Sequence, residues 1–146
     1  MRNLVAFRIQ QLWFALDAIW VEQILGEQHW MRVPAAPRQW PGVMAFRGRA
    51  VAVLDLAAGL PTAAPLRAAE RRHRTLIARA HDCAVAIPVD DVREVQAVED
   101  VQVFNAHATG HPLAREEVRL ERDVFALLDL PSLIAQATRT ATSARA

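Results

Sequence analysis

The chain has 146 residues, 53% of them hydrophobic, with 17 basic and 16 acidic side chains. This length and composition support a sizeable core and argue against global disorder, and a net charge of +1 does not indicate a nucleic-acid surface. The single cysteine excludes an intrachain disulfide, and neither a secretory signal nor a membrane-spanning run is evident. We therefore expect a cytoplasmic protein without direct membrane insertion.

The first half of the chain predicts a series of short β-strands. Apolar runs separated by polar or glycine-containing breaks lie at residues 4–9, 12–16, 43–46 and 50–54, and residues 22–25 are expected to form a further strand. The pair Gln10-Gln11 predicts one hairpin turn, and Gly48 predicts another because glycine accepts a positive φ. Asp17 and Asp55 are each placed to cap a short helical turn.

The second half repeats this plan. Its apolar runs lie at residues 76–79, 84–87, 118–120 and 124–128. Pro88 to Val92 matches the helical turn after Asp17, and Asp129 is placed to cap a terminal helix that ends near Ala137. Residues 138–146 are expected to form a flexible tail.

Particular residues carry the repeat. Leu16, Val21 and Ile24 each recur 71 positions later, as Ile87, Val92 and Val95. The triplet Leu54-Asp55-Leu56 recurs 74 positions later as Leu128-Asp129-Leu130. A long period seen twice predicts two duplicated small β-barrels, which would leave few exposed sheet edges. We expect Leu16 and Ile87 to face inward at equivalent strand positions, and Leu54 and Leu128 to be buried.

At this point the sequence resembles the CheW-like family of bacterial chemotaxis proteins. Residues 42–56 are similar to the family signature G-V-x-x-x-R-G-x-x-V-x-V-x-D-L. The turn and strand at 18–24 and the loop prolines Pro34 and Pro37 also resemble the family, as does the second-lobe pattern V-D-x-V at 89–92.

The resemblance implies a mostly β fold of two intertwined five-stranded β-barrel subdomains with short helical turns and a C-terminal helix. The N-terminal strand is expected to cross over to the second subdomain. The expected boundaries are a single domain over 1–137, with subdomain 1 at about 10–66, subdomain 2 at about 1–9 plus 70–137, and the tail at 138–146.

The resemblance also implies a non-catalytic adaptor that couples chemoreceptors to a CheA-type histidine kinase. Its implied partners are the kinase regulatory domain and the cytoplasmic hairpin tip of the receptor. The implied partner-binding residues are Arg47, Gly48, Val21 and Gln23. Arg47 is expected to project into water from its hairpin tip, where its planar guanidinium can grip carboxylate or carbonyl groups.

The sequence departs from the family pattern at three positions. Ala45 replaces a usual Asn, Ala52 a usual Pro and Gln23 a usual Glu. These departures leave a second interpretation open, in which the chain is a divergent accessory scaffold of a chemosensory array, or a CheW-like domain of another system, with a different partner.

The four tryptophans divide into two pairs. Trp30 and Trp40 are expected to pack in the core. Trp13 abuts a turn and Trp20 lies on one, where the family usually has polar residues, so either is a candidate anchor for a partner, since tryptophan is enriched in binding hot spots.

The sequence indicates neither catalysis nor a cofactor. No serine lies in a nucleophile motif, and no glycine-rich phosphate loop is present. His107 and His111 are four residues apart, but Gly110 and Pro112 argue against a helix that would align them on a metal. A remote alternative is a small β-barrel that binds single-stranded nucleic acid, which the balanced charge disfavours.

Overall fold

The computed structural model describes residues 2–59, 72–93, 96–99, 103–105, 116–120 and 123–145. The predicted loop at 61–69, most of the long loop at 99–116, and both His107 and His111 lie outside the described residues.

The fold is mostly β, with one long helix at its C-terminal end. The elements of the first half are β1 (Arg2–Ile9), β2 (Leu12–Asp17), η1 (Ala18–Trp20), β3 (Val21–Leu25), β4 (Met31–Arg32), β5 (Gly42–Phe46), β6 (Arg49–Val53) and η2 (Leu56–Gly59). Those of the second half are β7 (Arg74–Ala80), β8 (Cys83–Val89), β9 (Asp91–Val92), β10 (Gln96–Val98), β11 (Val103–Asn105), β12 (Glu116–Leu120), β13 (Asp123–Leu128) and α1 (Leu130–Arg145).

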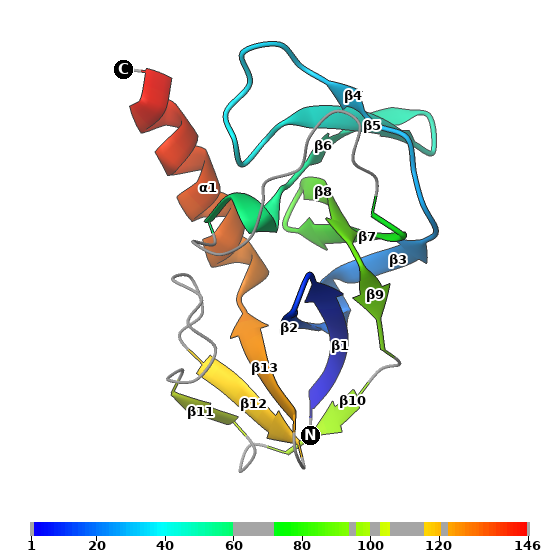
Figure 1. The fold of residues 1–146 in the computed structure, drawn as a ribbon, viewed down its shortest axis with the longest axis vertical. Coiled ribbons are helices and arrows are strands. Elements are labelled where there is room, and N and C mark those ends of the chain that lie inside the picture. The colour runs from blue at the N-terminus through cyan, green and yellow to red at the C-terminus, as the bar shows by residue number, and fades with distance from the viewer. Residues whose placement is uncertain are drawn as a thin grey trace.

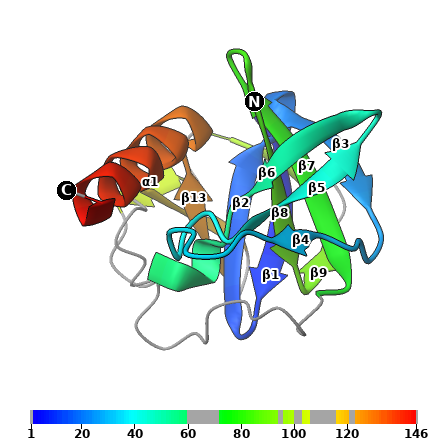
Figure 2. The same ribbon diagram turned by 90° about the horizontal axis from the view of Figure 1, so that it is seen from above.

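Two sheets hold the described strands, and Figure 1 shows one above the other, with α1 rising along one side from the end of β13. The upper sheet has six strands in the order β3-β7-β8-β6-β5-β4, and the lower has seven, ordered β10-β1-β2-β13-β12-β11 with β9 also paired to β1. In the described chain the upper sheet has one strand more than the expected five, the two-residue strand β4, and the lower sheet has two more, with β9 and β10 both paired to β1 and counted separately. Seen from above, α1 lies beside the strands rather than over the six-stranded sheet (Figure 2).

The two halves exchange hairpins. The β1–β2 hairpin of the first half lies in the seven-stranded sheet, between β10 and β13 of the second half. The β7–β8 hairpin of the second half lies in the six-stranded sheet, between β3 and β6 of the first. The pairing of β1 with β9 and β10 confirms the expected crossover of the N-terminal strand.

Strand pairing therefore divides the chain differently from the expected boundaries at residues 10 and 70. The strand β2 belongs with β1 and the second half, and both β7 and β8 belong with the first half. Apolar periodicity identifies strands but carries little information about their partners, so the sequence could not show the exchange.

The predicted repeat is confirmed in the register of the strands. Leu16 pairs with Val5 just as Ile87 pairs with Leu76. The parallel pairings also match, since β13 meets β2 at Leu127↔Ala15 and β6 meets β8 at Val53↔Ala86. Leu16, Ile87, Leu54 and Leu128 are all buried in one shared core cluster, as predicted.

One partly buried ionic contact ties the exchanged hairpin to the second half, and we call it the Asp90 clasp. Asp90 Oδ2 accepts hydrogen bonds from the backbone N–H of Gln10, at 2.6 Å, and from Nη1 of Arg72, at 2.7 Å. The Arg72 side chain is only 8% exposed. The clasp thus joins the β1–β2 turn to residues on both sides of the β7–β8 hairpin.

Two local expectations differ from the structure. The helix α1 continues to Arg145, beyond the expected end at Ala137, because after Pro131 its sequence has neither glycine nor proline and Thr138 bonds back to the Ile134 carbonyl. The helical turn after Asp17 has no counterpart at Pro88, where β8 continues to Val89. Asp17 caps its turn through its carboxylate, whereas proline has no side-chain acceptor for this role.

Candidate partner-binding site

The tip of the β5–β6 hairpin is a two-residue turn with an unusual backbone. Gly48 has a φ of 76°, as predicted, and Arg47 also has a positive φ, of 49°. Two consecutive positive φ values are typical of the type I′ turns that suit the twist of a hairpin. A non-glycine residue in this conformation costs about 1 kcal/mol, and such strain is common at functional sites.

The sequence led us to expect that the Arg47 side chain projects into water. In the structure it instead contacts residues of β3. Its Nη2 donates to Oε1 of Gln23 at 2.9 Å, and its Nη1 lies 3.6 Å from a carboxylate oxygen of Glu22. The guanidinium also lies 5.0 Å from the centre of the Phe46 ring. With 65% of the side chain exposed, Arg47 is fixed over β3 yet remains open to a partner.

A β-bulge in β3 places both of its polar residues near this arginine. The pairing with β7 shifts between Val21↔Ala78 and Gln23↔Ile77, so Glu22 is the extra residue. In a regular strand, adjacent side chains point to opposite faces, but a bulge re-aims one of them. Consequently both Glu22 and Gln23 contact Arg47.

Glu22 also reaches a second arginine. Its Oε2 lies 3.4 Å from Nε of Arg79, on β7. Beside this group is a surface hollow of about 450 Å³, which we call the hairpin hollow, because it lies between the β5–β6 and β7–β8 hairpins. Neither Glu22 nor Arg79 was expected at the site, since the pairing of β3 with β7 is not visible in the sequence.

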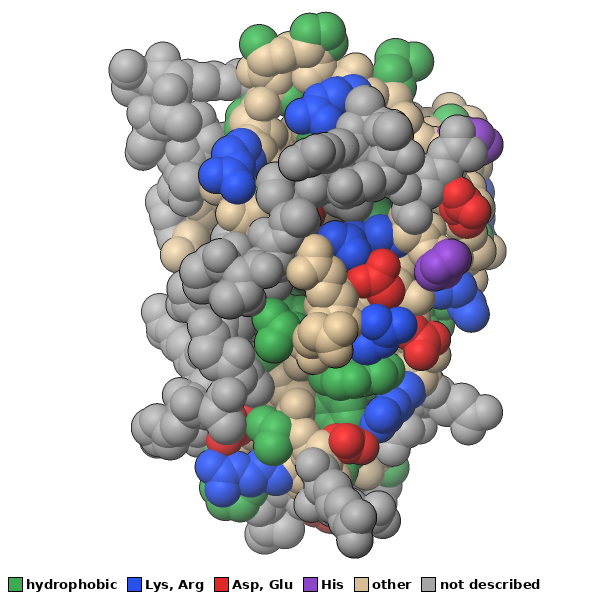
Figure 3. All heavy atoms as spheres, viewed as in Figure 1, with side chains coloured by type: hydrophobic (Ala, Val, Ile, Leu, Met, Phe, Trp, Pro, Cys, Tyr) green, Lys and Arg blue, Asp and Glu red, His purple; other side chains and the backbone are tan. Residues whose placement is uncertain are grey.

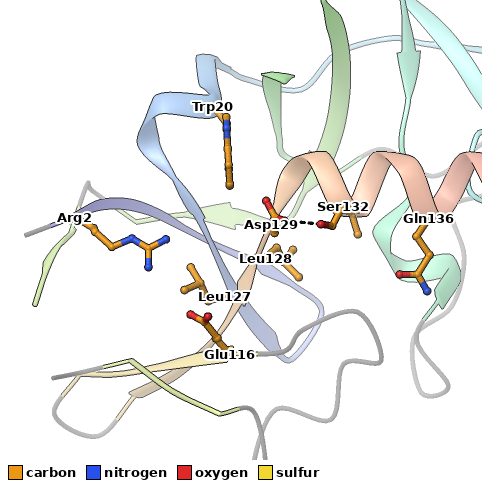
Figure 4. Close-up of a pocket in the computed structure, with 9 residues that line it drawn as sticks. Arg2, Trp20, Glu116, Leu127, Leu128, Asp129, Ser132 and Gln136 are labelled. Atoms are coloured by element: carbon orange, nitrogen blue, oxygen red, sulfur yellow. Dashed lines mark hydrogen bonds between the residues drawn. The ribbon is translucent and has the colours of Figure 1, made fainter. Parts of the chain in front are cut away.

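The other predicted partner residues on this side are partly buried. Val21 lies in β3 and packs against the main core cluster, as does Trp20 on η1. Trp20 also lines a second hollow of about 280 Å³ together with residues of β13 and α1 (Figure 4). The exposed apolar residue of η1 is instead Ile19, at 82%, which the sequence did not single out.

Trp13 lies on the seven-stranded sheet and not with the Arg47 group. Its ring makes an edge contact with Phe125 at 5.9 Å, and the Arg93 guanidinium lies 4.2 Å from it. Arg93 is in turn paired with Asp123 at 2.8 Å. Figure 3 shows one face of the molecule, on which basic and acidic side chains adjoin one another. The structure thus gives Trp13 a packing role, and Trp30 and Trp40 pack against buried clusters as expected.

Other polar residues considered in the sequence serve local structure. Ser132 donates to the carboxylate of Asp129 at the start of α1, and Asp55 accepts from the backbone N–H of Ala57. Within the described ranges, no group of three or more His, Cys, Asp and Glu side chains could hold a metal ion. No helix in the described part of the chain is long and apolar enough to cross a membrane.

Together, the fold and the Arg47 group define a small two-subdomain β protein with an exposed group of charged side chains at one hairpin tip. The family model described as the CheW-like domain matches residues 3–138. The chain belongs to this CheW-like domain family.

Individual proteins agree with this assignment. The chain is 27% identical over 141 residues to a probable chemotaxis protein CheW of Rhizobium etli, with 92% of this chain and 88% of the relative covered. It is 27% identical over 146 residues to the chemotaxis protein CheW of Rhizobium meliloti, with 96% and 92% covered. The crystal structure of the scaffolding protein TtCheW from Thermoanaerobacter tengcongensis has the same fold, with a TM-score of 0.74, 17% identity, and 88% and 84% of the two chains covered.

Proposed function

We propose that the chain is a non-catalytic cytoplasmic adaptor of chemotaxis signalling that couples a chemoreceptor to a CheA-type histidine kinase. The family match over residues 3–138 and the names of both relatives as chemotaxis proteins support this role. The proposed partners are the regulatory domain of the kinase and the cytoplasmic hairpin tip of the receptor.

The arrangement of Arg47 is the observation that carries the proposal. Its guanidinium is held by Gln23 and Glu22, on a strained turn, and is still largely exposed. A side chain ordered before binding loses less conformational entropy when a partner docks, which favours affinity. We therefore assign the partner contact to Arg47 and Gly48 with Val21 and Gln23 of β3.

A second candidate is a divergent accessory scaffold, and Gln23 favours it. The carboxylate that is usual at this position would form an ion pair with Arg47, whereas the Gln23 amide makes only a hydrogen bond to it. Arg47 consequently keeps more of its charge for an outside partner, which would alter the choice of partner. In this case the chain would bind only one of the two proposed partners, or neither.

The test is the substitution Arg47→Ala in calorimetric titrations against the kinase regulatory domain and the receptor tip. We expect affinity for at least one partner to fall tenfold or more, which is about 1.4 kcal/mol. The free energy of unfolding should change by no more than about 0.5 kcal/mol, since the lost contacts are exposed. Alanine keeps a Cβ, so the strain of the turn is unchanged.

The matched control is Arg38→Ala, which removes an exposed arginine that lines neither hollow. It should leave both affinities unchanged. If Arg47→Ala also leaves both unchanged, the site assignment is wrong. Wild-type binding to both partners supports the coupling adaptor, and binding to one alone supports the accessory scaffold.

A further inference from the structure

The hairpin hollow contains more positive than negative charge. Three arginines line it, Arg47, Arg49 and Arg79, against the two carboxylates of Glu22 and Asp82. Its remaining wall is formed mainly by apolar and small side chains, including Phe46 and Cys83. A concave surface of this kind concentrates the field of its charges and selects an oppositely charged group.

The carboxylate of Glu22 does not neutralise both Arg47 and Arg79. Glu22 is shared, since one of its oxygens is 3.6 Å from Arg47 and the other 3.4 Å from Arg79. One carboxylate between two guanidiniums leaves a net charge of +1, and each guanidinium has five N–H donors in a planar fork. The side chains of Arg47 and Arg79 are 65% and 43% exposed, so both present unused donors to the outside.

We propose that the hairpin hollow receives an acidic segment of the partner protein, with a carboxylate that bridges Arg47 and Arg79 on the side away from Glu22. The inference rests on the proposed function and adds the chemistry of the partner. Carboxylates match the guanidinium fork in a bidentate geometry. A continuous polyanion such as single-stranded nucleic acid fits less well, because Glu22 and Asp82 would repel its successive phosphates.

The chain offers a direct probe of this charge selection. Cys83 is its only cysteine, is exposed, and lines the hollow. A methanethiosulfonate reagent attacked by the Cys83 thiolate forms a mixed disulfide and releases methanesulfinate. One such reagent adds a negative sulfonate and another adds a positive trimethylammonium group, so the two labels are similar in size and opposite in charge.

The expected difference follows from simple electrostatics. The two labels differ by two elementary charges. For an assumed separation of about 8 Å between label and bound carboxylate, in a medium close to water, Coulomb's law gives about a fivefold difference in affinity. We expect the sulfonate-labelled protein to bind the partner affected by Arg47→Ala about fivefold more weakly than the trimethylammonium-labelled protein. The difference should shrink between 50 and 300 mM NaCl because salt screens it.

Two variants test the same idea without a label. Arg79→Gln should weaken binding about threefold to tenfold, whereas Asp82→Asn should strengthen it about twofold because a repelling charge is removed. A merely structural hollow would not gain affinity from Asp82→Asn. Thermal melting of each protein checks that its fold is intact.

The outcomes separate this inference from the proposed function. Equal affinities of the two labelled proteins, together with a loss for Arg47→Ala, would overturn the acidic partner and leave the adaptor role standing. The acidic segment would also be overturned, in favour of nucleic acid, if the chain bound a single-stranded oligonucleotide in a salt-dependent way and more tightly than it binds either partner protein. No loss for Arg47→Ala would instead contradict the proposed site itself.

Discussion

The Asp90 clasp should make a large contribution to stability for a contact near the surface. The Asp90 carboxylate accepts a hydrogen bond from Nη1 of Arg72. The Nε atom of the same guanidinium is buried and has no hydrogen-bond partner in the described structure. The substitution Asp90→Ala would leave a charged group, 8% exposed, without its counter-ion, and would also remove the acceptor of the Gln10 N–H. Breaking a buried pair in this way costs about 3–5 kcal/mol.

The Asp90 side chain is itself 19% exposed, so water can replace part of the interaction. We therefore expect Asp90→Ala to lower the free energy of unfolding by about 2–4 kcal/mol. For a chain of this size the melting temperature should fall by about 6–12 °C. Urea denaturation followed by circular dichroism measures the first quantity, and a thermal scan measures the second.

A double-mutant cycle separates the clasp from other effects of the substitution. In the Arg72→Ala background no buried charge remains to be stranded, so Asp90→Ala should cost only about 1 kcal/mol. A cost below about 1 kcal/mol in the wild-type protein, or equal costs in the two backgrounds, would refute the reasoning.

Three further substitutions test the core and the turn. Gly42→Ala should destabilise the fold by about 1–3 kcal/mol in urea denaturation, because a Cβ there would clash with the backbone carbonyl oxygen of Met31 and lie 2.6 Å from the Trp30 ring; a neutral result would contradict this packing. Leu16→Ala and Ile87→Ala should each cost about 3–5 kcal/mol and agree within about 1 kcal/mol, and clearly unequal losses would speak against equivalent positions. For Trp20→Ala, we expect a fall of several degrees in the melting temperature, which would assign Trp20 to the core, whereas weaker partner binding with unchanged melting would restore it as an anchor.

Much of the fold could be predicted because local chemistry determines it. The turn residues Gly48 and Asp17 marked a hairpin and a helical turn that the structure contains, and the duplicated pattern placed Leu16 and Ile87 correctly. The family resemblance implied the crossover of β1, but the exchange of both complete hairpins could not be predicted from the residues, because it depends on which strands pair. A strand with one apolar face packs equally well against any suitable neighbour.

The same limit applied to the site. Arg47 was identified from its turn and from the family signature, but its contacts with Glu22 and Gln23 depend on the bulge in β3. Arg79 joins the site only through the pairing of β3 with β7. The packing of Trp13 against Phe125 likewise joins strands 112 positions apart in the sequence, β2 and β13.

The exchanged hairpins have a consequence for how the protein holds together. A single half, taken alone, would have a hairpin with no sheet to join and a sheet with a hairpin missing from its middle. Only a second copy could supply the missing hairpin and accept the unpaired one. That arrangement is a domain-swapped homodimer. In this chain the two halves differ in sequence and are joined in one polypeptide. Their association is therefore intramolecular, whereas in a dimer it would depend on concentration. The interface between the halves is therefore protected from dilution, even at the few copies per cell at which a true dimer would come apart.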